Sequence, residues 1–109
     1  MISEVLKIAL ERKASDVILA PNNFACIKVD GSTEFLPDFG TLQKEELGRE
    51  ILGLIPENLK KRFAEELELD FGININGYGR FRANVLSQRY GTAIVFRVIQ
   101  DSIPQFASL

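Results

Sequence analysis

Histidine is absent from this chain of 109 residues, and Cys26 is its only cysteine. Without histidine there is no ordinary Ser–His or Cys–His nucleophile pair, and one cysteine cannot form a disulfide or a zinc site within a single chain. Cys26 lies inside a β-rich run, so we expect a small, buried core thiol. Its isolation fits a reducing, cytosolic setting.

Long apolar runs and a phosphate-binding glycine loop are also missing. No stretch reaches the roughly 18 apolar residues of a membrane span, and the N-terminal segment mixes charges into its apolar pattern, so we expect neither a membrane span nor a secretion signal. No glycine precedes a lysine, which excludes a P-loop here, and the glycines at 77 and 79 lead into a strand pattern instead of a helix. We expect that these residues alone do not hydrolyse nucleotides.

Acidic and basic residues nearly balance, with 15 Asp and Glu against 13 Lys and Arg. Non-specific nucleic-acid binders use a basic excess to release counterions, and this chain lacks one, so any phosphate contact must be local. The acidic residues from Glu65 to Asp70 can in principle hold a divalent cation. Most of them end a charged helical pattern, which favours a solvated face, and we expect no metal site.

Apolar periodicity and turn residues predict an α+β fold with the order α-β-β-β-α-α-β-β-β, in which helices pack against an antiparallel sheet. Ser3 is expected to cap the first helix, and the segment from Pro37 to Gly40 is expected to end the third strand. The expected elements are a helix from 3 to about 13, strands at 16–20, 24–30 and 33–36, helices at 42–55 and 56–67, and a three-strand meander from 70 to 99.

Alternation in the meander separates an apolar face from a face of guanidinium and amide groups. Phe81 and Val85 alternate with Arg80 and Arg82, and a similar pattern further along turns Arg97 outward. Arginine offers a planar fork of donors to phosphate oxygens and keeps its charge, so this face suits anions. The alternative for each arginine is a solvent-exposed residue that serves solubility.

Several motifs together resemble the N-terminal domain of the secretion ATPases, with the pilus-retraction, twitching-motility branch closest. The resemblance covers essentially the whole chain, in order and with natural spacings. The motifs are Ala14–Ser15–Asp16, Val29–Asp30–Gly31, Glu68-x-Asp70–Phe71, Gly79–Arg80–Phe81–Arg82-x-Asn84, Gln88–Arg89 and Phe96–Arg97-x-Ile99.

This resemblance implies a PAS-like N-terminal domain at residues 1–99 and, at 100–109, the start of a linker to a RecA-like ATPase domain. In such type IV pilus and type II secretion ATPases, six subunits form a ring that uses ATP and Mg at the cytoplasmic side of the inner membrane. The implied partners are the RecA-like domains of the same and the adjacent subunit and an inner-membrane platform protein, with no nucleic acid.

The same resemblance assigns roles to individual arginines. Arg82 and Arg97 match arginines that contact the terminal phosphates of ATP bound on the RecA-like domain, and Arg80 and Arg89 are possible additional contacts. By this interpretation the chain is a regulatory and assembly domain without a catalytic residue or a cofactor of its own. The alternatives are a freestanding module that binds phosphate ligands or nucleic acid through the arginine face, and a PAS-like sensor, which needs an interior pocket.

Overall fold

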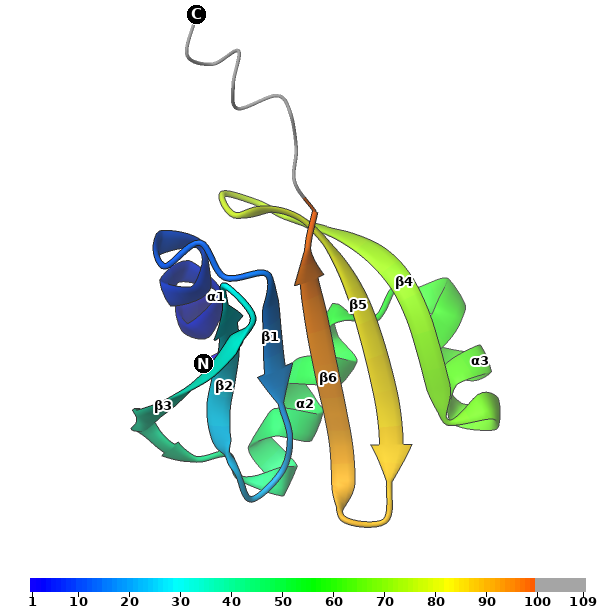
Figure 1. Ribbon diagram of the computed structural model, residues 1–109. Coiled ribbons are helices and arrows are strands. Elements are labelled where there is room, and N and C mark those ends of the chain that lie inside the picture. Colours follow the sequence, from blue (N-terminus) through cyan, green and yellow to red (C-terminus); the bar gives the residue numbers. More distant parts are fainter. Residues whose placement is uncertain (100–109) are drawn as a thin grey trace, which may run out of the picture.

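A six-stranded antiparallel sheet with the strand order β3-β2-β1-β6-β5-β4 forms the centre of the computed structural model, which describes residues 1–99. The helices α1, α2 and α3 lie behind this sheet in Figure 1 and leave its front face uncovered. The predicted fold class and element order are confirmed, while the predicted linker at 100–109 lies outside the described residues. The elements are α1 (Ile2–Glu11), β1 (Asp16–Leu19), β2 (Phe24–Val29), β3 (Ser32–Thr41), α2 (Lys44–Leu54), α3 (Glu57–Glu66), β4 (Glu68–Ile75), β5 (Gly79–Gln88) and β6 (Gly91–Val98).

The pairing of β1 with β6 joins two halves that are far apart in the sequence. The strands β1, β2 and β3 form one antiparallel group and β4, β5 and β6 form the other. Val17 on β1 is the register partner of Phe96 on β6, and Asp16 is the partner of Arg97. Both halves therefore contribute their apolar faces to one hydrophobic core beneath the helices.

The alternation predicted for the meander is confirmed. Phe81, Val85 and Phe96 are fully buried on the helix side of the sheet. The rings of Phe81 and Phe96 meet edge to face, with centroids 5.9 Å apart and an interplanar angle of 73°. This geometry adds an electrostatic preference to the burial of two large side chains at the centre of the core.

The predicted cap of the first helix is wrong, because Ser3 lies inside α1 and Met1 occupies the N-cap position. The backbone N–H of Ile2 instead donates a hydrogen bond of 2.9 Å to Oε1 of Glu50, which belongs to α2. A carboxylate is favourable at the positive end of a helix. The α1 N-terminus is therefore satisfied by a residue distant in sequence, which no local pattern signals.

The third strand is longer than predicted, because the segment from Pro37 to Gly40 does not end it. Ala25 pairs with Leu36, while the preceding Phe24 pairs with Thr41, so the intervening residues bulge out of the ladder. β3 is an edge strand of the sheet. An edge tolerates proline and bulges because its outer backbone groups have no strand to pair with.

The buried aromatic pair predicts a clear difference in stability between the two faces of the meander. Phe81→Ala and Phe96→Ala should each lower the free energy of unfolding by about 3–5 kcal/mol, because each leaves a cavity in a filled core. Arg82→Ala should lower it by less than about 1 kcal/mol, since its ion pair is exposed. Urea denaturation measures both, and equal losses on the two faces would show that the strand register is wrong.

Candidate anion-binding site

Arg82 and Arg97 lie side by side on the uncovered face of the sheet. They are register partners on the adjacent strands β5 and β6, which places their Cα atoms about 5 Å apart. Their side chains are 59% and 75% exposed. Two like charges directly across a strand pair are unfavourable, and negative charge beside them reduces this cost.

Two carboxylates on the neighbouring strands supply negative charge. Nη2 of Arg82 donates a hydrogen bond of 3.0 Å to Oδ1 of Asp70 on β4, and Nε of Arg97 lies 3.6 Å from Oδ2 of Asp16 on β1. Asp16 is only 15% exposed, and the Ser15 hydroxyl donates a hydrogen bond of 2.7 Å to its Oδ1. Each arginine therefore pairs away from the other, Arg82 with a carboxylate on β4 and Arg97 with one on β1.

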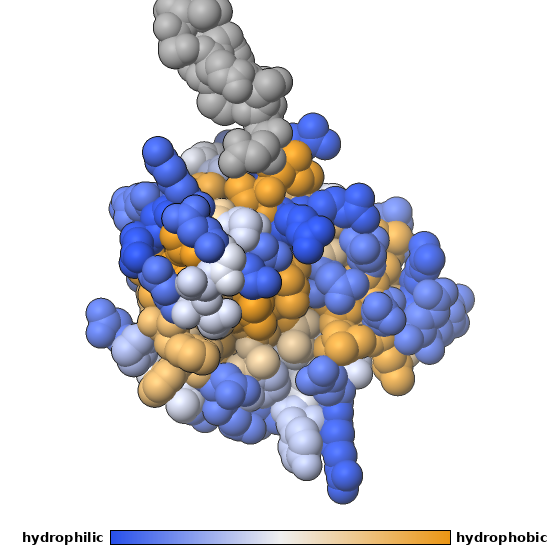
Figure 2. Space-filling view, viewed as in Figure 1, coloured by the Kyte–Doolittle hydropathy of each residue, from blue (hydrophilic) through white to orange (hydrophobic). Residues whose placement is uncertain are grey.

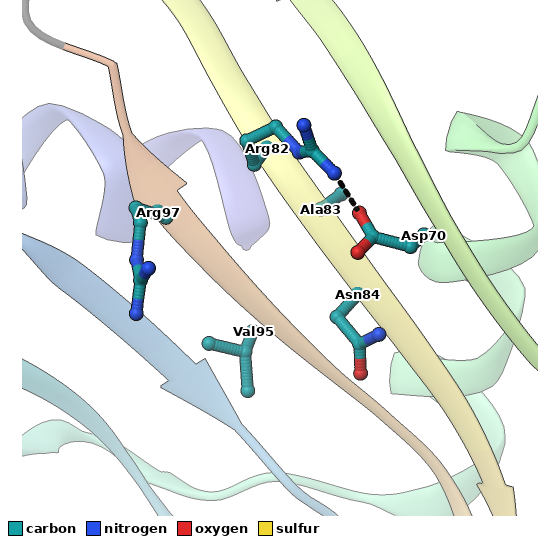
Figure 3. A pocket seen from close by; sticks show the side chains of 6 residues that line it. All are labelled: Asp70, Arg82, Ala83, Asn84, Val95 and Arg97. Carbon is teal, nitrogen blue, oxygen red and sulfur yellow. Dashed lines mark hydrogen bonds and ion pairs between the residues drawn. The ribbon is translucent and has the colours of Figure 1, made fainter.

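Between the arginines the surface forms an open depression of about 410 Å³ (Figure 3). The Arg82 guanidinium extends toward Asp70, and the Arg97 side chain lies over the part of the sheet next to β1 (Figure 3). Two cationic forks and one amide beside a small apolar floor suit the oxygens of a phosphate or another compact anion. The lining residues are Asp70, Arg82, Ala83, Asn84, Val95 and Arg97.

The other two predicted arginines lie outside this depression. Arg80 is on the same strand and face as Arg82, opposite Asn74, at the end of β5 next to the β4–β5 turn. Arg89 lies in the turn between β5 and β6, about 23 Å along the strand from Arg82, with its guanidinium carbon 5.9 Å from the centre of the Tyr90 ring. The structure thus brings Arg82 and Arg97 together and places Arg89 at the other end of the strand.

Asp16 and Asp70 are the parts of the site that the sequence did not single out as site residues. Asp70 was assigned to a solvated acidic cluster, and strand alternation alone places it on the same face as Arg82. Its neighbour Glu66 does behave as part of a solvated helix, where it contacts Arg62. Asp16 meets Arg97 only because β1 pairs with β6, and that contact has no local signal.

Comparisons with known proteins agree with this architecture, although no family model matches the chain. The chain is 30% identical over 102 residues to the type IV pilus retraction ATPase PilT of Pseudomonas aeruginosa, covering 94% of this chain and 29% of that protein. It is 31% identical over 107 residues to the type IV pilus ATPase PilU of the same organism, covering 97% of this chain and 28% of that protein. Among solved structures, the pilus retraction motor PilT with bound ADP superposes with a TM-score of 0.83 and 34% identity, over 97% of this chain and 31% of that one.

This chain is a homologue of the PilT-type ATPases. It matches their N-terminal domain, and it spans less than a third of the length of these relatives. The resemblance inferred from the motifs is therefore confirmed. The roles assigned to individual arginines are a separate prediction, which the comparisons do not address.

Within the part of this PilT-type domain that the structure describes, no helix is long and apolar enough to cross a membrane. In the same residues no three side chains of the metal-ligating types come together as a group. The uncovered face combines a band of apolar surface with hydrophilic groups around it (Figure 2). Ile18 and Val95, which are partly buried register partners on β1 and β6, belong to this face.

The prediction that Cys26 is buried is confirmed, although it lies on the face of the PilT-type domain that the helices leave open. Cys26 is 7% exposed, and its register partners are Ile18 on β1 and Phe35 on β3. Burial raises the pKa of the Cys26 thiol above its ordinary value of 9.0, and the nearby Lys28 ammonium lowers it in part. A raised pKa keeps the thiol protonated and weakly nucleophilic.

The raised pKa of Cys26 predicts a loss of stability at alkaline pH. The unfolded chain loses the thiol proton at a lower pH than the folded chain. The contribution of the protonated thiol to stability is therefore complete below the pKa of Cys26 in the unfolded chain, and it is lost as pH rises through the pKa of Cys26 in the folded chain. In urea denaturation, the free energy of unfolding should fall more between pH 7 and a pH above 9 for the parent chain than for Cys26→Ala.

A thiol-reactive probe gives the matched kinetic check. At pH 8 the folded chain should react at least about tenfold more slowly than the chain in urea. Identical rates in the two states would contradict the burial of Cys26.

Proposed function

We propose that this chain is the regulatory and assembly domain of a pilus-retraction or type II secretion ATPase. In this proposal Arg82 and Arg97 contact the terminal phosphates of ATP held by a RecA-like domain. The observation that carries it is the direct cross-strand pairing of these two exposed arginines around one open depression. Both residues also stand in the motifs that resemble the family.

Like-charge pairing explains why a phosphate is the favoured ligand. Two arginines that are register partners on adjacent strands repel each other, and an anion with several oxygens between their guanidiniums would replace this repulsion with attraction. Arginine keeps its charge through the whole reaction cycle, so it can stabilise charge that develops during phosphoryl transfer and sense the γ-phosphate. Both side chains are exposed enough to rotate toward a shared ligand within nanoseconds.

The one-sided packing of the sheet supports a docking role for the same face. All the helices of the described residues lie on the opposite side, so the arginines face outward without a covering element (Figure 1). Apolar side chains such as Val95 border the arginines, and burying them against another domain would exclude water from the phosphate contact. A domain that moves with respect to its ATPase domain can then couple nucleotide state to mechanical output.

Nucleotide binding and hydrolysis would take place on a RecA-like domain and not on this chain. Because the chain has no P-loop, ATP and Mg would be bound by a RecA-like domain reached through a linker that starts at 100–109. The partners would be the RecA-like domains of the same and the adjacent subunit in a homohexamer, together with an inner-membrane platform protein. The assembled protein would be cytoplasmic and peripheral to the inner membrane, and Arg80 would be an accessory contact at the rim.

A freestanding module for phosphate ligands is the second candidate, because the depression is formed entirely by this chain. The nucleic-acid version of this candidate is disfavoured by the net charge of −2 and by the carboxylates beside both arginines. A salt-sensitive shift of single-stranded RNA by this chain would favour it over the ATPase-domain role.

Substitutions in the full-length ATPase that carries this domain test the main proposal. Arg82→Ala and Arg97→Ala should each lower kcat for ATP hydrolysis by more than about tenfold, since each removes a donor that stabilises transition-state charge. Lysine at either position should restore little activity, because a single ammonium lacks the bidentate fork.

The matched control for these substitutions is Arg62→Ala, which removes an exposed arginine that is ion-paired on α3, away from the sheet face. It should leave kcat within about twofold, because surface substitutions of this kind change little. Hydrolysis at the parent rate by both the Arg82 and the Arg97 variant would overturn the phosphate-contacting role.

A further inference from the structure

The two carboxylates of the site lie nearest to different parts of the two guanidiniums, one in an ion pair without a hydrogen bond and the other in a hydrogen bond. Asp16 approaches Nε of Arg97, the nitrogen within the side chain, at 3.6 Å. Asp70 accepts a hydrogen bond of 3.0 Å from Nη2 of Arg82, a nitrogen of the terminal fork. A guanidinium has five donors, so a contact at Nε leaves both terminal nitrogens available, whereas a contact at Nη2 occupies part of the fork.

We propose that Asp16 is a positioning residue for Arg97 and that Asp70 is a competitor that an anion must displace from Arg82. This inference rests on the proposed function, since it concerns how the same two arginines engage phosphate. It assigns opposite roles to two carboxylates that lie on the same face of the sheet.

Asp16 is built as a fixed support. It is 15% exposed and receives the hydrogen bond from the Ser15 hydroxyl. Ser15 is itself held by the backbone on both sides, because its N–H donates to the carbonyl of Lys28 at 2.8 Å and its carbonyl accepts from the N–H of Val98 at 2.9 Å. A support held in this way lowers the conformational entropy that Arg97 loses when its terminal nitrogens bind an anion.

Asp70 has the opposite character. It is 53% exposed, lies on the edge strand β4, and makes its contact with a terminal nitrogen of Arg82. An exposed ion pair of this kind is worth little, and a phosphate group offers more charge and more acceptor oxygens to the same fork. The carboxylate therefore occupies Arg82 until a stronger anion replaces it.

Opposite roles predict opposite changes in anion affinity, which separates this proposal from its simplest rivals. A purely electrostatic effect would raise the affinity when either carboxylate is neutralised, because the site becomes more positive. A purely structural effect would lower it in both cases. Only the proposed arrangement makes Asp70→Asn tighten the site and Asp16→Asn weaken it.

The experiment uses the 109-residue chain with inorganic tripolyphosphate as the probe, at constant ionic strength. The Nε–Hε signals of Arg82 and Arg97 in two-dimensional ¹⁵N NMR report anion binding at each arginine separately. Relative to the control variant Glu68→Gln, Asp70→Asn should raise the apparent affinity for tripolyphosphate at Arg82 by about threefold. Asp16→Asn should lower the apparent affinity at Arg97 by about threefold. Both factors lie in the range expected for an exposed ion pair.

Glu68→Gln is the matched control, because Glu68 lies two residues before Asp70 on the same strand and face, and it is not an ion-pair partner of either arginine. It corrects for the general effect of removing one negative charge. Asp16→Asn should also move the Arg97 Nε–Hε signal in the absence of the probe, while the Arg82 signal stays in place.

A second variant, Ser15→Ala, can replace Asp16→Asn if Asp16→Asn does not fold. Ser15→Ala removes only the hydroxyl that holds Asp16, and it should weaken binding at Arg97 in the same direction by a smaller factor. If the Asp16 and Asp70 variants change the affinity for tripolyphosphate in the same direction, or no more than Glu68→Gln does, the inference is overturned. No response of either arginine to tripolyphosphate in the parent chain would instead count against the proposed function itself.

Discussion

The antiparallel pairing of β1 with β6 is the contact on which both the fold and the candidate site depend. It joins two groups of three strands into one sheet, so that the helices can cover a single continuous apolar face. The same pairing sets Asp16 opposite Arg97, and β5 then places Arg82 on the other side of Arg97. A shift of one residue in this register would turn the arginines into the core and the phenylalanines out, so the packing of Phe96 also determines the position of the charged groups.

One-sided coverage of the sheet gives the domain its functional surface. Antiparallel sheets commonly pack one face on a core and expose the other, and here the exposed face carries two adjacent cations with a carboxylate on each flank. Folding alone does not require two facing arginines, and their mutual repulsion is a small local cost that an anionic partner would reverse. The carboxylates reduce this cost in the free domain, which makes the arginine pair compatible with a stable sheet before any ligand arrives.

Much of the architecture could be predicted from the sequence because the deciding signals are local. Period-two alternation places Phe81 inside and Arg82 outside, and turn glycines such as Gly77 and Gly79, which adopt positive φ angles, mark the hairpin between β4 and β5. The features that could not be predicted depend on tertiary contacts. Glu50 caps α1 from another helix, Pro37 lies in a bulge of the edge strand β3, and the carboxylate partners of the arginines follow from strand register. The family resemblance assigned roles to the arginines but none to Asp16 and Asp70, the carboxylates that pair with them.

The most direct test of whether Arg82 and Arg97 contact the γ-phosphate is a structure of the full-length ATPase with a non-hydrolysable ATP analogue bound. In that structure the Arg82 and Arg97 side chains should leave their divergent positions and place guanidinium nitrogens about 2.7–3.1 Å from γ-phosphate oxygens. Asp70 should no longer contact Arg82, while Asp16 should remain beside Nε of Arg97. A nucleotide-bound structure in which both arginines stay on their carboxylates, with the γ-phosphate contacted by other residues, would contradict the account.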